Sequence, residues 1–190
     1  MSITRILKAG LFSLTILSLS LSNASAADYN IDPTHGFVEF KIPHMGISLL
    51  SGRFNKYEGT LSWDQNNPSA SSIEVKIDTT SVDTNHAQRD EHISAESYLN
   101  VAAHPTATFK STKYEGNADS GKLMGDFTLN GITKSITIDV TRYGEGKDNW
   151  GGYRVGFSGE TTLKGGDFYK NPMLNTDIAV ELSVEAIQKK

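Results

Sequence analysis

The fold is decided by short stretches in which apolar and polar residues alternate, and the clearest include residues 71–79, which read SSIEVKIDT. In an extended chain Ile73, Val75 and Ile77 point to one side, and the charged residues between them point to the other. A strand of this kind has one face that must be buried and one that stays in water. The stretch therefore predicts a β-strand that covers an apolar interior.

The same alternation recurs through residues 27–190, in about nine stretches that are mostly joined by short turns. Asn130-Gly131 separates two of them and is typical of a two-residue hairpin turn, because both residues tolerate a positive φ. A longer strand is expected over residues 51–64, with Gly59 as a bulge. So many amphipathic strands hide their apolar faces and edges most simply in a closed barrel. The sequence therefore predicts an all-β fold built as an antiparallel barrel.

Two stretches lack the alternation. Residues 83–99 contain good helix formers, and Asp83 or Thr84 could cap a helix start. A short helix is therefore expected near residues 86–97. Residues 164–176 are rich in glycine, asparagine and proline, which indicates a loop with one turn of helix at most.

The N-terminus has the pattern of a secretory signal peptide. Arg5 and Lys8 precede an apolar run over residues 11–21, and Ala24-Ser25-Ala26 follows as a cleavage site. An uncleaved membrane anchor is the alternative, but the apolar run is too short to span a bilayer. We therefore expect a signal peptide over residues 1–26.

A single periplasmic domain, residues 27–190, is expected after cleavage. The chain has no cysteine, which fits that compartment and excludes thiol catalysis and thiolate metal sites. Removing the two cations of the signal peptide leaves 16 Lys and Arg against 22 Asp and Glu, a formal charge of −6. An acidic chain without a basic cluster is a poor nucleic-acid binder and does not bind anionic lipid by charge alone. We expect no nucleic-acid partner and no stable membrane insertion, and a homodimer is left open.

Several motifs resemble the YceI-like family. The most specific is residues 79–92, TTSVDTNHAQRDEH, and the hairpin 125–134, GDFTLNGITK, is similar to a second family signature. The likeness covers nearly all of residues 28–190 and also includes Tyr98-Leu99-Asn100, His104-Pro105, Phe109, His35 with Val38 and Phe40, and His44-Met45-Gly46. It implies a lipocalin-like antiparallel barrel of eight or slightly more strands, usually periplasmic, that holds a polyisoprenoid or similar long-chain amphiphile without catalysis.

The interior of such a barrel is either a filled core or an apolar cavity. Periodicity alone favours a filled core, because small barrels are often filled by their own side chains. The family resemblance favours a cavity. The residues expected to face the interior are Val38, Phe40, Ile42, Ile73, Val75, Ile77, Phe127, Leu129, Ile136, Ile138 and Phe157.

A polar head group would be held near the predicted helix. Arg89 presents a planar fork suited to phosphate or carboxylate, and His92 and Asn85 could add hydrogen bonds. Asp90 could orient Arg89, or the two could form a structural pair that pins the helix to the rim. His44 is expected to line the opening or to end its strand.

The leading hypothesis is a binding or carrier protein for a long-chain isoprenoid lipid, either a quinone or a polyprenyl phosphate, with no cofactor and no metal. A metal-dependent or acid–base enzyme built on His86 and His92 is one alternative. However, the chain has no His-x-x-x-His pair and no Gly-x-Ser-x-Gly motif. A ligand-free stress protein with a solid core is the other alternative.

Overall fold

The computed structural model describes residues 26–190, so the predicted signal peptide lies outside the described residues except for Ala26. Its strands form one antiparallel sheet of 11 strands, which closes because β11 pairs with both β2 and β1. The strands are β1 (Ala27–Ile31), β2 (Phe37–His44), β3 (Ser48–Phe54), β4 (Tyr57–Trp63), β5 (Ser72–Asp78), β6 (Val82–Asp83), β7 (Thr106–Gly116), β8 (Ser120–Leu129), β9 (Ile132–Lys147), β10 (Tyr153–Lys164) and β11 (Asp177–Gln188).

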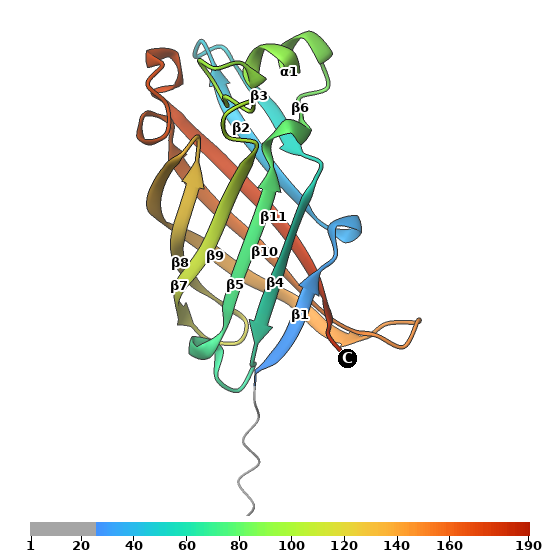
Figure 1. The fold of residues 1–190 in the computed structure, drawn as a ribbon. Helices are drawn as coiled ribbons and strands as arrows, with labels where there is room; N and C mark the ends of the chain where they lie inside the picture. Colours follow the sequence, from blue (N-terminus) through green and yellow to red (C-terminus); the bar gives the residue numbers. More distant parts are fainter. Residues whose placement is uncertain (1–25) are drawn as a thin grey trace, which may run out of the picture.

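The 11 strands form a barrel with eight strand positions. Three of these positions are each filled by two consecutive strands, namely β1 with β2, β3 with β4, and β5 with β6. β1 and β2 lie along different parts of β11, with the short helix η1 (Pro33–His35) between them. β4 pairs with β1 and β3 with β2, and β5 and β6 continue in the same way. Each position is therefore adjacent to the positions that precede and follow it in sequence. The predicted antiparallel barrel is confirmed (Figure 1).

The strand that introduced the alternation is β5, in which Ile77 is buried and Glu74 and Lys76 are exposed. The predicted hairpin turn is also confirmed, since φ is 52° at Asn130 and 73° at Gly131. A Cβ atom at Gly131 would lie 2.6 Å from Cε1 of His104, so this position needs glycine for space as well as for its φ.

The predicted bulge at Gly59 is wrong. Gly59 pairs in regular register with Val75, and the predicted long strand is instead interrupted after Phe54. At the interruption the backbone N–H of Asn55 donates to the carbonyl of Ser81, and that of Lys56 donates to the Ser81 hydroxyl. Bonds to this neighbouring turn replace ladder bonds, which separates β3 from β4.

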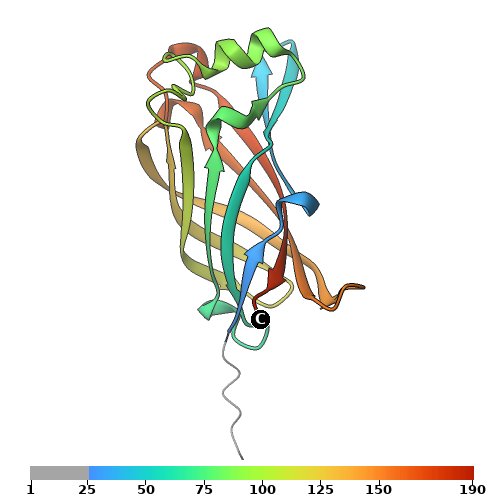
Figure 2. The same cartoon turned by 45° about the vertical axis from the view of Figure 1, so that its right-hand side comes forward.

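The helix α1 (Ala87–Ser94) is shorter than predicted and crosses one end of the barrel, opposite the end where β1 starts and β11 finishes (Figures 1 and 2). Its N-cap is His86, whose Nδ1 accepts from the backbone N–H of Arg89, so the predicted Asp83 or Thr84 cap is wrong. Asn85, with a φ of 60°, turns the chain just before the helix and shifts the cap to the next residue.

The loop after β10 also lies at the α1 end (Figure 1). It contains two short 3-10 helices, η4 (Gly165–Asp167) and η5 (Pro172–Leu174), where at most one turn was expected. Phe168, only 1 % exposed, packs its ring against Phe127 at 5.5 Å and fastens the loop to the barrel. Among the described residues, no helix is both long and apolar enough to span a membrane.

Candidate ligand-binding cavity

The barrel contains a cavity of about 850 Å³. Its wall is largely aliphatic and aromatic. Ile73, Val75, Phe127 and Ile136 line it and remain partly exposed, although they point inward. They are exposed because the side chains facing them stop short of filling the interior. The filled-core alternative is therefore wrong for the part of the barrel that these four residues line.

The structure brings all the predicted site residues to this one cavity. The strands contribute most of them, β2 ends at the cavity opening, and the segment around α1 contributes the polar ones. The cavity is lined by Val38, Phe40, Ile42, His44, Ile73, Val75, Ile77, Asn85, Arg89, His92, Phe127, Leu129, Ile136, Ile138 and Phe157. Their lining position is an observation, and their role in binding stays a prediction.

Aromatic residues close the inner end of the cavity. Trp63 and Phe157 meet edge to face at 5.0 Å, and Tyr114 lines the same region. The indole N–H of Trp63 donates to Oε2 of Glu145 at 3.1 Å, and the hydroxyl of Tyr114 donates to the carbonyl of Asn117. Because these polar groups bond away from the cavity, the inner end offers a ligand an apolar surface.

At the other end, Arg89 is held by Thr84. Its Nε donates to Oγ1 of Thr84 at 2.7 Å, and its Nη2 donates to the Thr84 carbonyl at 2.6 Å. Asp90 accepts from the N–H and the hydroxyl of Thr84, at 2.8 and 2.5 Å. Arg89 and Asp90 do not form the direct pair that was one of the two alternatives, since both side chains bind Thr84, whose organising role sequence reasoning missed.

The charge of Arg89 has no ion-pair partner within residues 26–190. Thr84 fixes one edge of its guanidinium, and none of the hydrogen bonds found in that part of the chain uses Nη1. A half-buried cation that is oriented but not neutralised is suited to an anionic or carbonyl-bearing group.

The other polar residues of this end are exposed. Asn85 has an exposed side chain, and His92 packs edge to face on Tyr98 at 4.7 Å. His86 is used as the helix cap. Within residues 26–190, neither His86 nor His92 belongs to a group of three potential metal ligands. The enzyme alternative thus gains no support from this arrangement.

Tyr169 is a cavity residue that sequence reasoning did not select. It belongs to the loop after β10, where no periodicity shows which side chains turn inward. Burial raises the pKa of its hydroxyl, which is already well above neutral, so this group is a neutral hydrogen-bond donor. Within the described residues the hydroxyl makes no hydrogen bond, which leaves it available to donate to a ligand oxygen inside the cavity.

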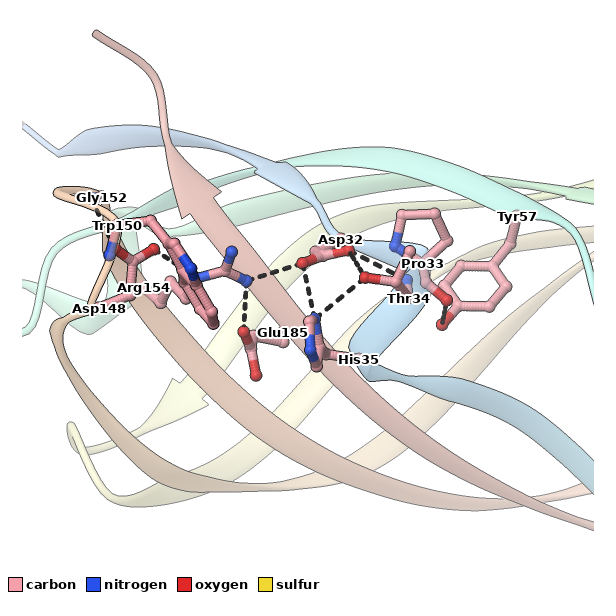
Figure 3. A network of polar contacts seen from close by, with 10 residues as sticks. All are labelled: Asp32, Pro33, Thr34, His35, Tyr57, Asp148, Trp150, Gly152, Arg154 and Glu185. Atoms are coloured by element: carbon pink, nitrogen blue, oxygen red, sulfur yellow. Dashed lines mark hydrogen bonds and ion pairs between the residues drawn. The ribbon is translucent and has the colours of Figure 1, made fainter.

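On the outside of the barrel, a network of charges ties the ends of β1 and β10 to β11 (Figure 3). Arg154 Nη1 lies 2.7 Å from Asp32 Oδ2 and 2.5 Å from Glu185 Oε1, and its Nε lies 2.7 Å from Asp148 Oδ2. The ring of Trp150 packs on the same guanidinium, with Cζ 5.7 Å from the ring centroid.

This network lowers the pKa of two of its carboxyl groups. Burial acts to raise the pKa of Asp32, but hydrogen bonds from Thr34, Arg154 and His35 outweigh it and hold that pKa well below its usual range. The hydrogen bond from Arg154 lowers the pKa of Asp148. Asp32, His35 and Glu185 come within 4.8 Å of one another, but Arg154 already binds two of them. The cluster is therefore a structural clamp across the closing seam of the barrel.

A closed antiparallel barrel with an apolar cavity that reaches the surface at one end belongs to the class of ligand-enclosing barrels, of which lipocalins are the best-known example. A family model, the YceI-like domain, matches residues 29–186, and the chain belongs to this family. The resemblance seen in its motifs is confirmed.

Known proteins agree with this assignment. A UPF0312 protein of Pseudomonas paraeruginosa is 48% identical over 171 residues, covering 87% of this chain and 90% of that protein. The crystal structure of a Campylobacter jejuni YCEI protein is 31% identical, with a TM-score of 0.69 over 79% of this chain and 91% of that one. A polyisoprenoid-binding domain from Saccharophagus degradans shares the fold, with a TM-score of 0.63 at 16% identity over 86% of this chain and 99% of that one.

Proposed function

We propose that this protein binds and carries a long-chain isoprenoid lipid, such as a quinone or a polyprenyl phosphate. The apolar tail lies in the barrel and the polar head lies near α1. The observation that carries the proposal is the cavity of about 850 Å³ with its apolar wall. A dry cavity of about 150 Å³ holds one benzene molecule, so this one has room for roughly five groups of that size.

The wall can supply most of the affinity without directional contacts. Burial of a methylene group contributes about 0.8 kcal/mol, so each five-carbon unit contributes on the order of 3–4 kcal/mol before the losses of immobilisation are subtracted. Because one methylene changes the affinity little, the wall discriminates weakly between chains of similar length.

The head would lie where the cavity has its polar groups. Arg89 offers an oriented cation to a phosphate, and the neutral hydroxyl of Tyr169 offers a donor to a quinone carbonyl. His92 and Asn85 remain candidates for additional contacts, because both line the cavity. The polyisoprenoid-binding domain of Saccharophagus degradans, which has the same fold, supports this class of ligand.

We place the protein in the periplasm, as a carrier that meets its lipid there. The support is the signal-peptide pattern of residues 1–26 and the absence of cysteine. Fractionation of cells that express the full chain tests the location, with mature protein beginning at Ala27 expected in the periplasmic fraction. Recovery of an uncleaved chain in the cytosol would contradict it.

The binding test combines extraction with uptake. Mass spectrometry of an organic extract from the purified protein is expected to show a long-chain isoprenoid, and added quinone is expected to bind. Val75→Asp places a charge on the cavity wall and should abolish uptake, because the charge would lose its hydration to the ligand.

Lys76→Asp is the matched control, since the adjacent side chain of the same strand is exposed on the outer face. It is expected to bind quinone like the unmodified protein. The proposal fails if no lipid is extracted and no quinone binds, or if both variants bind it equally.

A further inference from the structure

The cavity reaches the surface beside two segments that contain no Asp, Glu, Lys or Arg, although Asp167 and Lys170 lie earlier in the loop that carries η5. The turn between β2 and β3 lies in residues 42–50, which read IPHMGISLL, and η5 lies in residues 171–175, which read NPMLN. Both loops lie at the α1 end of the barrel (Figures 1 and 2). Uncharged segments at a cavity opening can enter an apolar medium without dehydrating an ion.

The apolar side chains of these loops extend into solvent. Met45 is 78 % exposed, Ile47 82 %, Leu49 68 % and Met173 79 %. Three of them, Met45, Leu49 and Met173, also line the cavity. We call these four residues the entrance rim. It makes the apolar surface continuous from the cavity wall to the outside of the protein.

The turn holds the backbone of Met45 in an unfavourable conformation, and the apolar side chain of Met45 is exposed to water. Its φ is 55° and that of Gly46 is 71°, and the N–H of Ile47 donates to the carbonyl of His44 at 3.0 Å. Asn, Asp and Gly are the residues that tolerate a positive φ best. Met45 packs into neither hydrophobic cluster of the described residues, so we look for its role outside the molecule.

We propose that the entrance rim docks on the surface of a lipid bilayer, with Met45, Ile47 and Leu49 inserted among the lipids. This rests on the proposed function, because an isoprenoid tail leaves a bilayer most easily where the apolar path is unbroken. A bilayer fits better than an acidic or basic partner, since the rim has no charge to pair. The contact is apolar, in keeping with the negative charge of the whole chain.

The experiment is flotation of the purified, ligand-free protein with neutral phosphatidylcholine vesicles. Ile47→Asp is the test variant, because Ile47 is exposed and does not line the cavity. Tyr143→Asp is the matched control, a 79 % exposed aromatic in the part of β9 that lies near the opposite end. Ile47→Asp should lower the vesicle-bound fraction at least about tenfold, and Tyr143→Asp should leave it unchanged.

Uptake of a short-chain quinone added without vesicles separates this proposal from the proposed function. It is expected to be the same in Ile47→Asp and the unmodified protein. If neither takes up quinone while flotation still depends on Ile47, the carrier function fails and docking stands. Docking is overturned if flotation does not depend on Ile47, or if sedimentation velocity shows that Ile47→Asp dissociates a dimer, which would make a second copy the occupant.

Discussion

Apolar and polar side chains alternate along the strands at both ends of the barrel, but the interior is packed differently at the two ends. Towards the end where β1 starts, Tyr29, Leu61, Trp63, Val155 and Ala186 pack into a cluster in which every member is at most 7 % exposed. Leu61 and Trp63 of this cluster also form the inner wall of the cavity, and from there towards α1 the inward residues surround open space. Alternation therefore determines which side chains face inward, and their sizes and shapes decide whether they meet.

The polar groups differ between the halves in the same way. Near the closing seam, Arg154 is bound by three carboxylates, while at the α1 end Arg89 has hydrogen bonds to Thr84 and no carboxylate partner in residues 26–190. The charge of Arg154 is neutralised by ion pairs within the fold, and the charge of Arg89 remains available to a ligand. The comparison teaches that an arginine's role depends on what its charge already meets.

The largest expected effect comes from placing the same charge in both halves. Val155→Asp should lower the free energy of unfolding by at least about 4 kcal/mol or prevent folding, because Val155 is 1 % exposed and a carboxylate there would lose its hydration. Val75→Asp should fold with a smaller loss, since water in the cavity can hydrate the carboxylate. Urea unfolding measures both. Equal losses would show that the two halves are packed alike.

An intermediate effect is expected at the clamp. Arg154→Met should lower the urea midpoint at neutral pH, because it leaves Asp32 and Asp148 without their cation. The pKa values of both carboxyls are lowered in the folded protein, so their contribution is present above the unfolded value of about 4 and is lost as the pH falls below it.

Urea midpoints at several pH values test this sign. The difference between Arg154→Met and the unmodified protein should be largest above pH 5 and should shrink as the pH falls below about 4. A difference that grows on acidification would contradict the assigned role of the clamp.

The smallest effect on stability, and a selective one on binding, is expected at Arg89. Arg89→Ala should weaken binding of a polyprenyl phosphate by roughly 10–100-fold and leave a headless isoprenoid nearly unaffected. Tyr169→Phe is the comparison, expected to weaken a quinone several-fold but not the phosphate. Equal losses for the two ligands in Arg89→Ala would show that Arg89 only braces the loop before α1.

The sequence predicted the barrel and its inward residues well, because a period of two leaves little freedom over which side chains share a face. Val75 and Phe127 show this, since both line the cavity as their strands predicted. It could not decide between a cavity and a core, because that depends on how far side chains reach across the barrel. Loops have no periodicity that shows which side chains turn inward. The roles of Thr84, Tyr169 and the entrance rim were therefore not predicted.

The order of the strands has a consequence for how the chain folds. Most pairings join segments close in sequence, but at closure β11 pairs with β1 and β2, so that Tyr29 faces Gln188 near the two ends of the domain. Contacts between distant segments form slowly, because the intervening chain must first be ordered. We expect closure to be the late step of folding, so that a chain shortened before β11 would collapse into an open, adhesive sheet. Pulse-labelling hydrogen exchange should show the amides of β1 protected last.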